Sequence, residues 1–155
     1  MKINLKDCKT SAQAVTKICY NEETRNLNFR IECENLDDLL ECVHIIKGYN
    51  DFDWKVINEN LVEYANFKRY YNHDNPNNGK DLLTYEIGRE GSPVIYIKYF
   101  SISMLGNEYE ENGEIKKLTQ ELFEKNMKAL GALVKADECD FGNDGCYDYC
   151  RLWWD

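Results

Sequence analysis

The sequence has no long apolar run. None of its apolar stretches approaches the length that a membrane-spanning helix needs. The first ten residues, MKINLKDCKT, carry charges where an export signal has its apolar segment. These two absences predict a protein that is neither inserted into a membrane nor exported. We therefore expect it in the cytoplasm, with its cysteines reduced.

The motifs that mark common enzyme classes are also missing. The sequence contains no GxSxG, HExxH, GxGxxG or GxxxxGK[ST] pattern. Its two histidines, His44 within a helical pattern and His73 within a loop, offer no pairing for acid–base chemistry. We therefore predict a protein that is not an enzyme and needs no cofactor.

Positive charge is in short supply. There are 19 Lys and Arg residues against 28 Asp and Glu residues, which gives a net charge of −9. This balance repels phosphate backbones, which argues against direct contact with nucleic acid, and it favours a partner whose surface is basic. No feature of the sequence specifies an oligomeric state.

The sequence does contain enough apolar and aromatic residues for one packed core. Apolar residues make up 43% of the 155 positions, and there are 11 Tyr, 6 Phe and 3 Trp residues. A chain of this size and composition most simply folds as one domain, here residues 1–155. Its centre is predicted to be a hairpin over residues 81–103, because two runs rich in Tyr, Ile and Val flank a turn at Arg89-Glu90-Gly91-Ser92.

Further strands are expected before this hairpin. Residues 14–34 are interpreted as a first hairpin, and the part from Leu27 to Glu34 alternates strictly between apolar and polar residues. Residues 53–58 and 61–71 are interpreted as two more strands, although the spacing in the second segment also fits a helical turn.

Two apolar stripes at helical spacing predict helices over residues 36–47 and 114–135. Asn35 and Asn112 are expected to cap them. The sequence thus predicts a single α+β domain, with a mainly antiparallel sheet of about five or six strands and two helices packed on it.

Residues 137–155 combine acidic and aromatic side chains. Six acids stand against one arginine there, so the segment holds five of the nine net negative charges. Carboxylates attract Lys and Arg residues of a partner, and aromatic rings supply contact area. We interpret the segment as an acidic C-terminal tail that binds a partner; the alternative is a solvated end whose tryptophans fold back over the sheet. The predicted partner-binding residues are Asp137, Glu138, Asp140, Asp144, Tyr147, Asp148, Trp153 and Trp154.

Three of the seven cysteines, Cys139, Cys146 and Cys150, lie in the same segment. Closely spaced thiolates hold zinc if a fourth ligand, such as Cys8 or His73, joins them, but the strong paired CxxC spacing is absent. A disulfide within the segment is another alternative. Free thiols are the simplest interpretation, and a small zinc-stabilised interaction module is kept as an alternative function.

Asp53-Trp54-Lys55, at the start of a possible strand, resembles the carboxylate-x-Lys end of metal-dependent nuclease sites. An acid on a neighbouring strand would be needed to complete such a site. A metal-dependent nuclease is therefore a second alternative, which the acidity of the chain disfavours.

Together these features predict a non-catalytic acidic inhibitor or binding protein that docks on a basic protein surface. In size, charge and lack of catalytic motifs the chain is similar to the immunity proteins that neutralise bacterial toxins. Phage proteins that inhibit host defence nucleases share these general features and provide another alternative. The expected partner is a protein with a basic surface, such as a toxin or a nuclease, rather than nucleic acid or a membrane.

Overall fold

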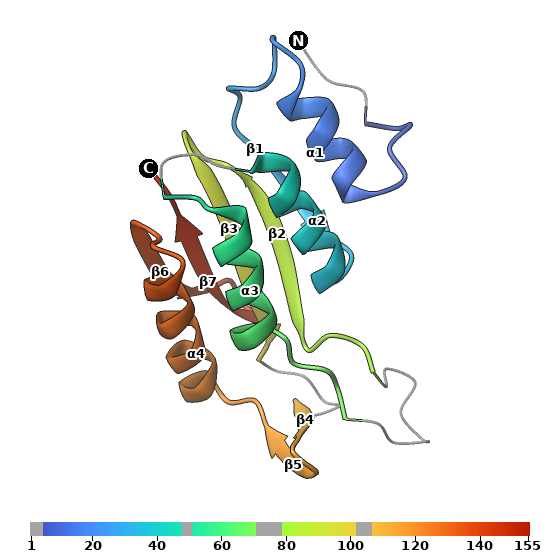
Figure 1. The fold of residues 1–155 in the computed structure, drawn as a ribbon. Helices are drawn as coiled ribbons and strands as arrows, with labels where there is room; N and C mark the ends of the chain where they lie inside the picture. The colour runs from blue at the N-terminus through green and yellow to red at the C-terminus, as the bar shows by residue number, and fades with distance from the viewer. Residues whose placement is uncertain (1–4, 48–50, 71–78, 102–106) are drawn as a thin grey trace.

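The computed structural model describes residues 5–47, 51–70, 79–101 and 107–155. Figure 1 shows a twisted sheet with α2, α3 and α4 on one side of it and a small separate hairpin near one end. In the described ranges the helices are α1 (Ser11–Cys19), α2 (Leu36–Ile46), α3 (Trp54–Tyr64) and α4 (Gln120–Leu133). The strands are β1 (Phe29–Cys33), β2 (Leu83–Arg89), β3 (Pro93–Phe100), β4 (Glu108–Glu111), β5 (Glu114–Lys117), β6 (Glu138–Asn143) and β7 (Tyr147–Trp153).

The main sheet, as described, has five strands in the order β1-β2-β3-β7-β6, and all neighbouring strands are antiparallel. β4 and β5 form a separate two-stranded sheet. The predicted α+β class and antiparallel sheet are confirmed, although the described residues form four helices rather than two. The predicted central hairpin is present as β2 and β3, and Gly91 in its turn has a φ of 74°, which glycine adopts at low cost.

The core lies between the sheet and the helices. Tyr85, Ile97 and Leu152 come from neighbouring strands and are each at most 1% exposed. Trp154 follows β7 on the same side of the sheet, where its ring packs edge-on against Phe52 with the centroids 4.9 Å apart. α4 completes the core with Phe123, Met127 and Leu130.

α2 forms as predicted, because Asn35 caps it by accepting a hydrogen bond from the backbone N–H of Asp38. The second predicted helix begins later than expected. Residues 114–117 form β5, and α4 begins at Gln120 with Thr119 as its cap. Asn112 and Gly113 both have positive φ and join β4 to β5, which is the conformation that an Asn-Gly hairpin turn requires.

Two predicted strand segments are helices. Residues 14–19, at the start of the expected first hairpin, belong to α1 (Ser11–Cys19), whose buried Ala12, Val15 and Ile18 recur every three residues. Residues 54–64 form α3, which begins at the Asp53 cap and buries Ile57 and Leu61, four residues apart. The strand interpretation of both segments was wrong. Their β-branched residues favour strands, but the spacing of their buried residues by three or four positions is that of a helix.

Residues 137–155 belong to the main sheet. β6 and β7 form a hairpin, and β7 pairs with β3 along its whole length, from Val94 opposite Trp153 to Phe100 opposite Tyr147. The segment therefore supplies two strands of the sheet and is not a projecting tail. Within the described ranges, no helix is both long enough and apolar enough to cross a membrane.

Candidate protein-docking surface

The face of the sheet turned away from the helices carries the candidate site. Side chains alternate between the two faces of a strand, and the register aligns Glu86, Tyr96, Arg151 and Asp140 in one row across four strands. None of the helices described lies over this face (Figure 1). We call it the open face. Its strands and connecting turns contribute Arg30, Glu32, Glu86, Glu90, Tyr96, Lys98, Phe100, Glu138, Asp140, Asp144, Tyr147, Tyr149, Arg151 and Trp153.

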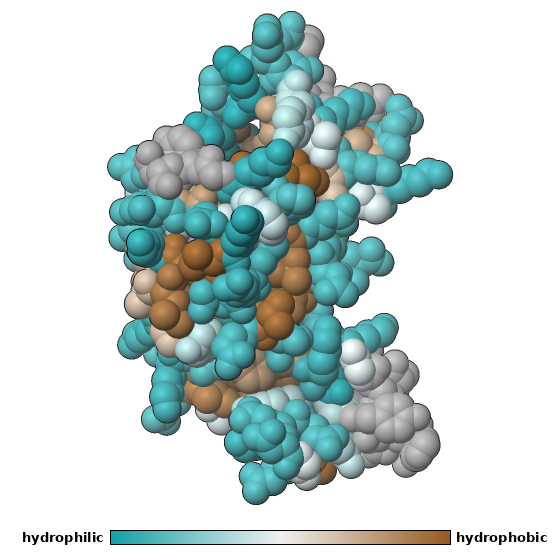
Figure 2. All heavy atoms as spheres, in the orientation of Figure 1, coloured by the Kyte–Doolittle hydropathy of each residue, from teal (hydrophilic) through white to brown (hydrophobic). Residues whose placement is uncertain are grey.

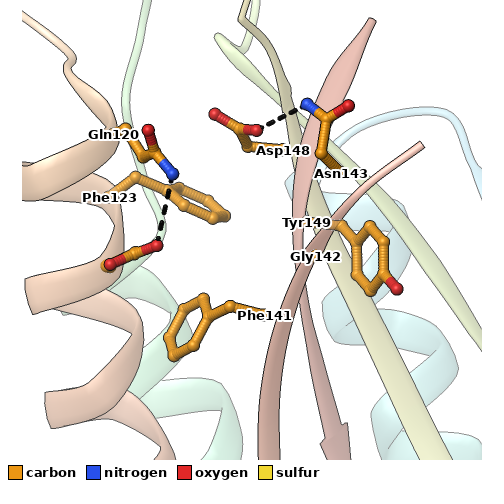
Figure 3. Close-up of a pocket in the computed structure, with 8 residues that line it drawn as sticks. Gln120, Phe123, Phe141, Gly142, Asn143, Asp148 and Tyr149 are labelled. Atoms are coloured by element: carbon orange, nitrogen blue, oxygen red, sulfur yellow. Dashed lines mark hydrogen bonds between the residues drawn. The ribbon is translucent and has the colours of Figure 1, made fainter. Parts of the chain in front are cut away.

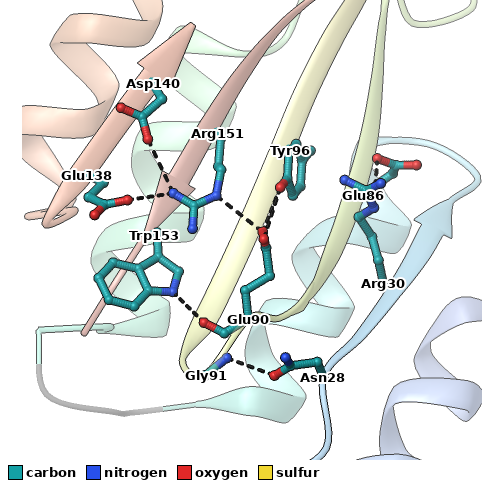
Figure 4. Close-up of polar contacts among 10 residues, drawn as sticks. All are labelled: Asn28, Arg30, Glu86, Glu90, Gly91, Tyr96, Glu138, Asp140, Arg151 and Trp153. Carbon is teal, nitrogen blue, oxygen red and sulfur yellow. Dashed lines mark hydrogen bonds and ion pairs between the residues drawn. The ribbon is translucent and has the colours of Figure 1, made fainter. Parts of the chain in front are cut away.

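Arg151 is the centre of the polar network on the open face (Figure 4). Its Nη1 donates to Glu138 Oε2 at 2.6 Å and to Asp140 Oδ2 at 3.2 Å, and its Nε donates to Glu90 Oε1 at 3.2 Å. Glu138 and Asp140 come from β6, whereas Glu90 comes from the turn between β2 and β3. One guanidinium therefore gathers three carboxylates from both sides of β7.

Glu90 links this network to two aromatic side chains. The Tyr96 hydroxyl donates to Glu90 Oε1 at 2.6 Å, and the Trp153 indole Nε1 donates to the Glu90 backbone oxygen at 2.9 Å. The guanidinium of Arg30 lies 4.5 Å from the centroid of the Tyr96 ring, within the range of a cation–π interaction. These contacts fix the orientation of the Tyr96 and Trp153 rings on the open face.

The pKa values follow from this geometry. Partial burial would raise the pKa of Glu90, but the hydrogen bonds from Tyr96 and Arg151 outweigh it and hold the pKa below its usual value. Burial and the neighbouring Glu90 carboxylate raise the pKa of Tyr96. Burial would lower the pKa of Arg151, but its hydrogen bonds to Glu138 and Glu90 raise it. Glu90 and Arg151 are therefore ionised at neutral pH, and Tyr96 is a neutral donor.

A second base on the open face is also paired with acids. Lys98 Nζ lies 3.4 Å from Glu86 Oε2 and 3.2 Å from Asp144 Oδ2. Glu86 Oε2 is in turn 3.8 Å from Arg30 Nε. Glu86 thus reaches Lys98 from the neighbouring strand β2, and Asp144 reaches it from the β6–β7 turn.

Opposite charges on the open face differ in their exposure. The side chains of Arg151 and Lys98 are 20% and 16% exposed, whereas those of Glu138, Asp140 and Asp144 are 49%, 59% and 41% exposed. Over the whole face, six carboxylates stand against three basic side chains. Arg151 and Lys98 thus lie low and hold these acids in place, whereas the Arg30 side chain is 50% exposed. The outer layer around Arg151 and Lys98 is therefore mainly negative.

Aromatic rings fill the space between these charges. The Phe100 and Tyr147 rings have centroids 5.2 Å apart, and those of Tyr96 and Tyr149 are 6.0 Å apart. The Tyr149 ring lies over Gly142, since a Cβ on that glycine would come within 2.5 Å of the phenol oxygen. Apart from Tyr96, these rings are neither fully buried nor fully exposed, so they offer apolar contact area beside the carboxylates.

Five of the eight residues predicted to bind a partner come together on the open face. They are Glu138, Asp140, Asp144, Tyr147 and Trp153.

The structure separates the other three from this group. Asp137 accepts a hydrogen bond from the backbone N–H of Asp155. Asp148 points to the helix side, where the Asn143 amide donates to it at 2.7 Å. Trp154 is 0% exposed and its Nε1 donates to the Val134 backbone oxygen, so the expectation that its ring is presented outward was wrong.

The sequence interpretation missed most of the network around these residues. Arg151 and Tyr149 lie in the same segment and share the odd-numbered alternation of Tyr147 and Trp153, which could have identified them. Glu90 and Tyr96 lie about 60 residues earlier in the chain, and only the pairing of β3 with β7 brings them to Arg151.

A hollow of about 240 Å³ lies at the helix side of the same hairpin, between the start of α4 and the β6–β7 strands. Phe123 and Phe141 form apolar walls, and Gln120 and Asp148 lie at its rim (Figure 3). Two pairs of its polar side chains bond to each other: Gln120 donates to Glu124, and Asn143 donates to Asp148. The helix side shows apolar patches broken up by polar side chains (Figure 2).

The residues weighed for metal chemistry are arranged differently from the predictions. Asp53 caps α3 and Lys55 lies within that helix, so the strand end that the nuclease interpretation requires does not form. Cys139 and Cys150 are in contact, whereas Cys146 is exposed in the β6–β7 turn. Among the described residues, no three His, Cys, Asp or Glu side chains are grouped so as to hold a metal ion. His73 lies outside the described residues.

The chain matches no protein-family model, no curated protein and no solved structure. Function is therefore inferred from the geometry of the open face.

Proposed function

We propose that the protein is a non-catalytic inhibitor or binding protein of the toxin-immunity type, and that it docks on a basic protein surface through the open face. The observation that carries it is the unequal exposure of opposite charges around Arg151 and Lys98. Arg151 and Lys98 are mostly covered, while Glu138 and Asp140, which both pair with Arg151 (Figure 4), are about half exposed. A surface of this kind attracts Lys and Arg side chains of a partner.

Preorganisation supports the same proposal. The acids are held by Arg151 and Lys98, and Trp153 is held by its hydrogen bond to Glu90, so little side-chain freedom remains to be lost on binding. Aromatic side chains beside fixed charges are typical of the residues that contribute most to protein–protein affinity. We propose a cytoplasmic location, where free thiols such as its seven cysteines are ordinarily reduced.

The test measures binding to a panel of purified basic proteins that includes nuclease toxins and defence nucleases, together with inhibition of their nuclease activity. The double variant Glu138→Gln/Asp140→Asn removes two negative charges and keeps the side-chain shapes. It should weaken binding about tenfold and slow association most at low salt. Trp153→Ala should weaken binding by a similar or larger factor.

The matched control is Glu59→Gln/Glu63→Gln, which removes two exposed charges from α3 on the other side of the molecule. It should leave affinity unchanged. Affinity that responds equally to both double variants, or that ignores salt, would exclude the open face as the docking surface. Inhibition of a toxin or of a defence nuclease decides between immunity and anti-defence roles.

A further inference from the structure

Two cysteine side chains touch on the helix side of the β6–β7 hairpin. Cys139 Sγ and Cys150 Sγ are 3.8 Å apart. Cys139 lies opposite Leu152 and Cys150 lies opposite Phe141, so the two cysteines are diagonal neighbours across the strand pair. Their side chains converge, because this distance corresponds to van der Waals contact between the sulfur atoms.

We propose that Cys139 and Cys150 form a reversible disulfide when the protein meets a disulfide oxidant such as glutathione disulfide. This bond would join β6 to β7 beneath the open face. It is a covalent modification site, separate from the proposed docking function and independent of it.

The two thiols differ in a way that gives each a role in this reaction. A hydrogen bond from the Cys150 thiol lowers the pKa of Cys139 and outweighs the opposing effect of burial. The same hydrogen bond and deeper burial raise the pKa of Cys150. Cys139 is also partly exposed, whereas Cys150 is 0% exposed. Cys139 is therefore the thiol that an external oxidant meets first.

The reaction proceeds by two exchanges. The Cys139 thiolate attacks one sulfur of glutathione disulfide, the sulfur–sulfur bond of the oxidant breaks, and one glutathione thiolate leaves. Cys150 then loses its proton and attacks the Cys139 sulfur of the mixed disulfide, which releases the second glutathione. The two protein sulfurs are oxidised by two electrons, the glutathione disulfide is reduced, and the two thiol protons end on the two glutathione molecules.

Packing around the pair permits the bond and restricts its geometry. The sulfur atoms must approach from 3.8 Å to about 2.0 Å. β6 is an edge strand of the described sheet and pairs only with β7 there, so it can shift toward its neighbour. On the other side α4 blocks retreat, since a Cβ added at Gly131 would lie only 3.0 Å from Cys139 Sγ.

A second cysteine pair gives an internal control. Cys33 and Cys42 also share a thiol hydrogen bond, which raises the pKa of Cys33, but these residues are only 4% and 0% exposed. A thiol–thiol interaction is thus common to both pairs, whereas side-chain exposure is not. Cys146 is exposed, and we expect it to stop at a mixed disulfide with glutathione.

The experiment exposes the purified full chain to increasing glutathione disulfide, alkylates the remaining thiols and maps the peptides by mass. The first internal product should be a Cys139–Cys150 cross-link, which has lost two hydrogen atoms and is reversed by dithiothreitol. Cys33 and Cys42 should become alkylated only after denaturation. In Cys150→Ser, Cys139 should retain glutathione as a stable adduct, whereas Cys146→Ser should leave the cross-link unchanged.

The wild-type peptide map decides the matter even if a variant does not fold. Cys139 and Cys150 both remaining free while Cys146 is modified would overturn the proposal. A cross-link from Cys146 to either residue, or a permanent glutathione adduct on Cys139 in the wild type, would also overturn it.

Discussion

The two faces of the main sheet are built from the same strands but differ in almost every physical property. On the helix side, Tyr85, Ile97 and Leu152 are sealed under the helices. On the open face, their neighbours in sequence, Glu86 and Arg151 among them, form ion pairs at the surface. The difference indicates that stability depends mainly on one face, which leaves the other free to carry charges and rings that a core would exclude.

The largest expected effect comes from exchanging one tryptophan of each face for alanine. Trp154→Ala removes a fully buried ring and its hydrogen bond to Val134, and should lower the free energy of unfolding by about 4 kcal/mol. Trp153→Ala, on the open face, should lower it by about 1 kcal/mol. Urea unfolding of both variants measures the difference, and equal losses would break the division between the faces.

Two glycines of the open face differ in what an added Cβ atom would meet, backbone at Gly88 and a side chain at Gly142. A Cβ on Gly88 would lie 2.0 Å from the Phe29 backbone oxygen, so Gly88→Ala forces β1 away from β2 and should cost about 3 kcal/mol. A Cβ on Gly142 would meet the phenol end of Tyr149, which can turn aside, so Gly142→Ala should cost less than about 1 kcal/mol. Thermal melting of the two variants tests this order; a greater loss in Gly142→Ala would contradict it.

Arg151 tests how much the network contributes to stability. Arg151→Ala leaves Glu90, Glu138 and Asp140 without their shared cation and should lower the free energy of unfolding by about 1 kcal/mol at pH 7. The loss should shrink in acid, as the pH falls through the lowered pKa of Glu90 and its carboxylate becomes protonated.

The control for Arg151 is Lys116→Ala, which breaks an exposed pair with Glu111 on the small β4–β5 sheet. Its effect on unfolding should be close to zero. If the two variants lose the same free energy in urea titrations at pH 7, the network has no structural role beyond that of an ordinary surface ion pair.

The smallest effect concerns the pH dependence of Glu90. Its pKa is lower in the folded protein than in the unfolded chain, so its ionised form stabilises the fold above the ordinary carboxyl pKa. That contribution is lost as the pH falls through the folded-state value, below about 4.3. The stability difference between wild type and Glu90→Gln should therefore favour the wild type near pH 7, by less than about 1 kcal/mol, and vanish in acid.

Urea titrations from pH 7 to pH 3 follow this difference, and Glu114→Gln on the exposed strand β5 serves as the control. A difference that grows as the pH falls would have the opposite sign and would show that Glu90 is not favoured in its ionised form.

Local signals predicted part of this fold. The central hairpin and α2 were identified because a glycine turn and an asparagine cap are specified by neighbouring residues. α1 and α3 were not predicted, since a short stretch with Val and Ile fits both the two-residue period of a strand and the 3.6-residue period of a helix. The start of α4 was misplaced because Asn112 was read as a cap, although Asn112-Gly113 is a strong hairpin signal.

Composition singled out residues 137–155 but as a tail, whereas they form β6 and β7, and alternation along β7 decides which of its residues take part in the candidate site. Trp153 and Trp154 have the same side chain, yet one lies on the open face and the other in the core, because adjacent residues of a strand point in opposite directions. The partners of Arg151 could not be predicted from the sequence, since Glu90 reaches it only through the pairing of β3 with β7.

The position of β7 between β3 and β6 has a consequence for how the molecule is made. β3 is the most apolar strand, and its partner on one side is supplied by residues 147–153, which are synthesised long after it. Until residues 147–153 are synthesised, β3 of a nascent chain has one unpaired edge, and its Val, Ile and Tyr side chains are prone to associate with other chains. Folding should accordingly be slow, with a window in which chaperones or aggregation compete for the same strand.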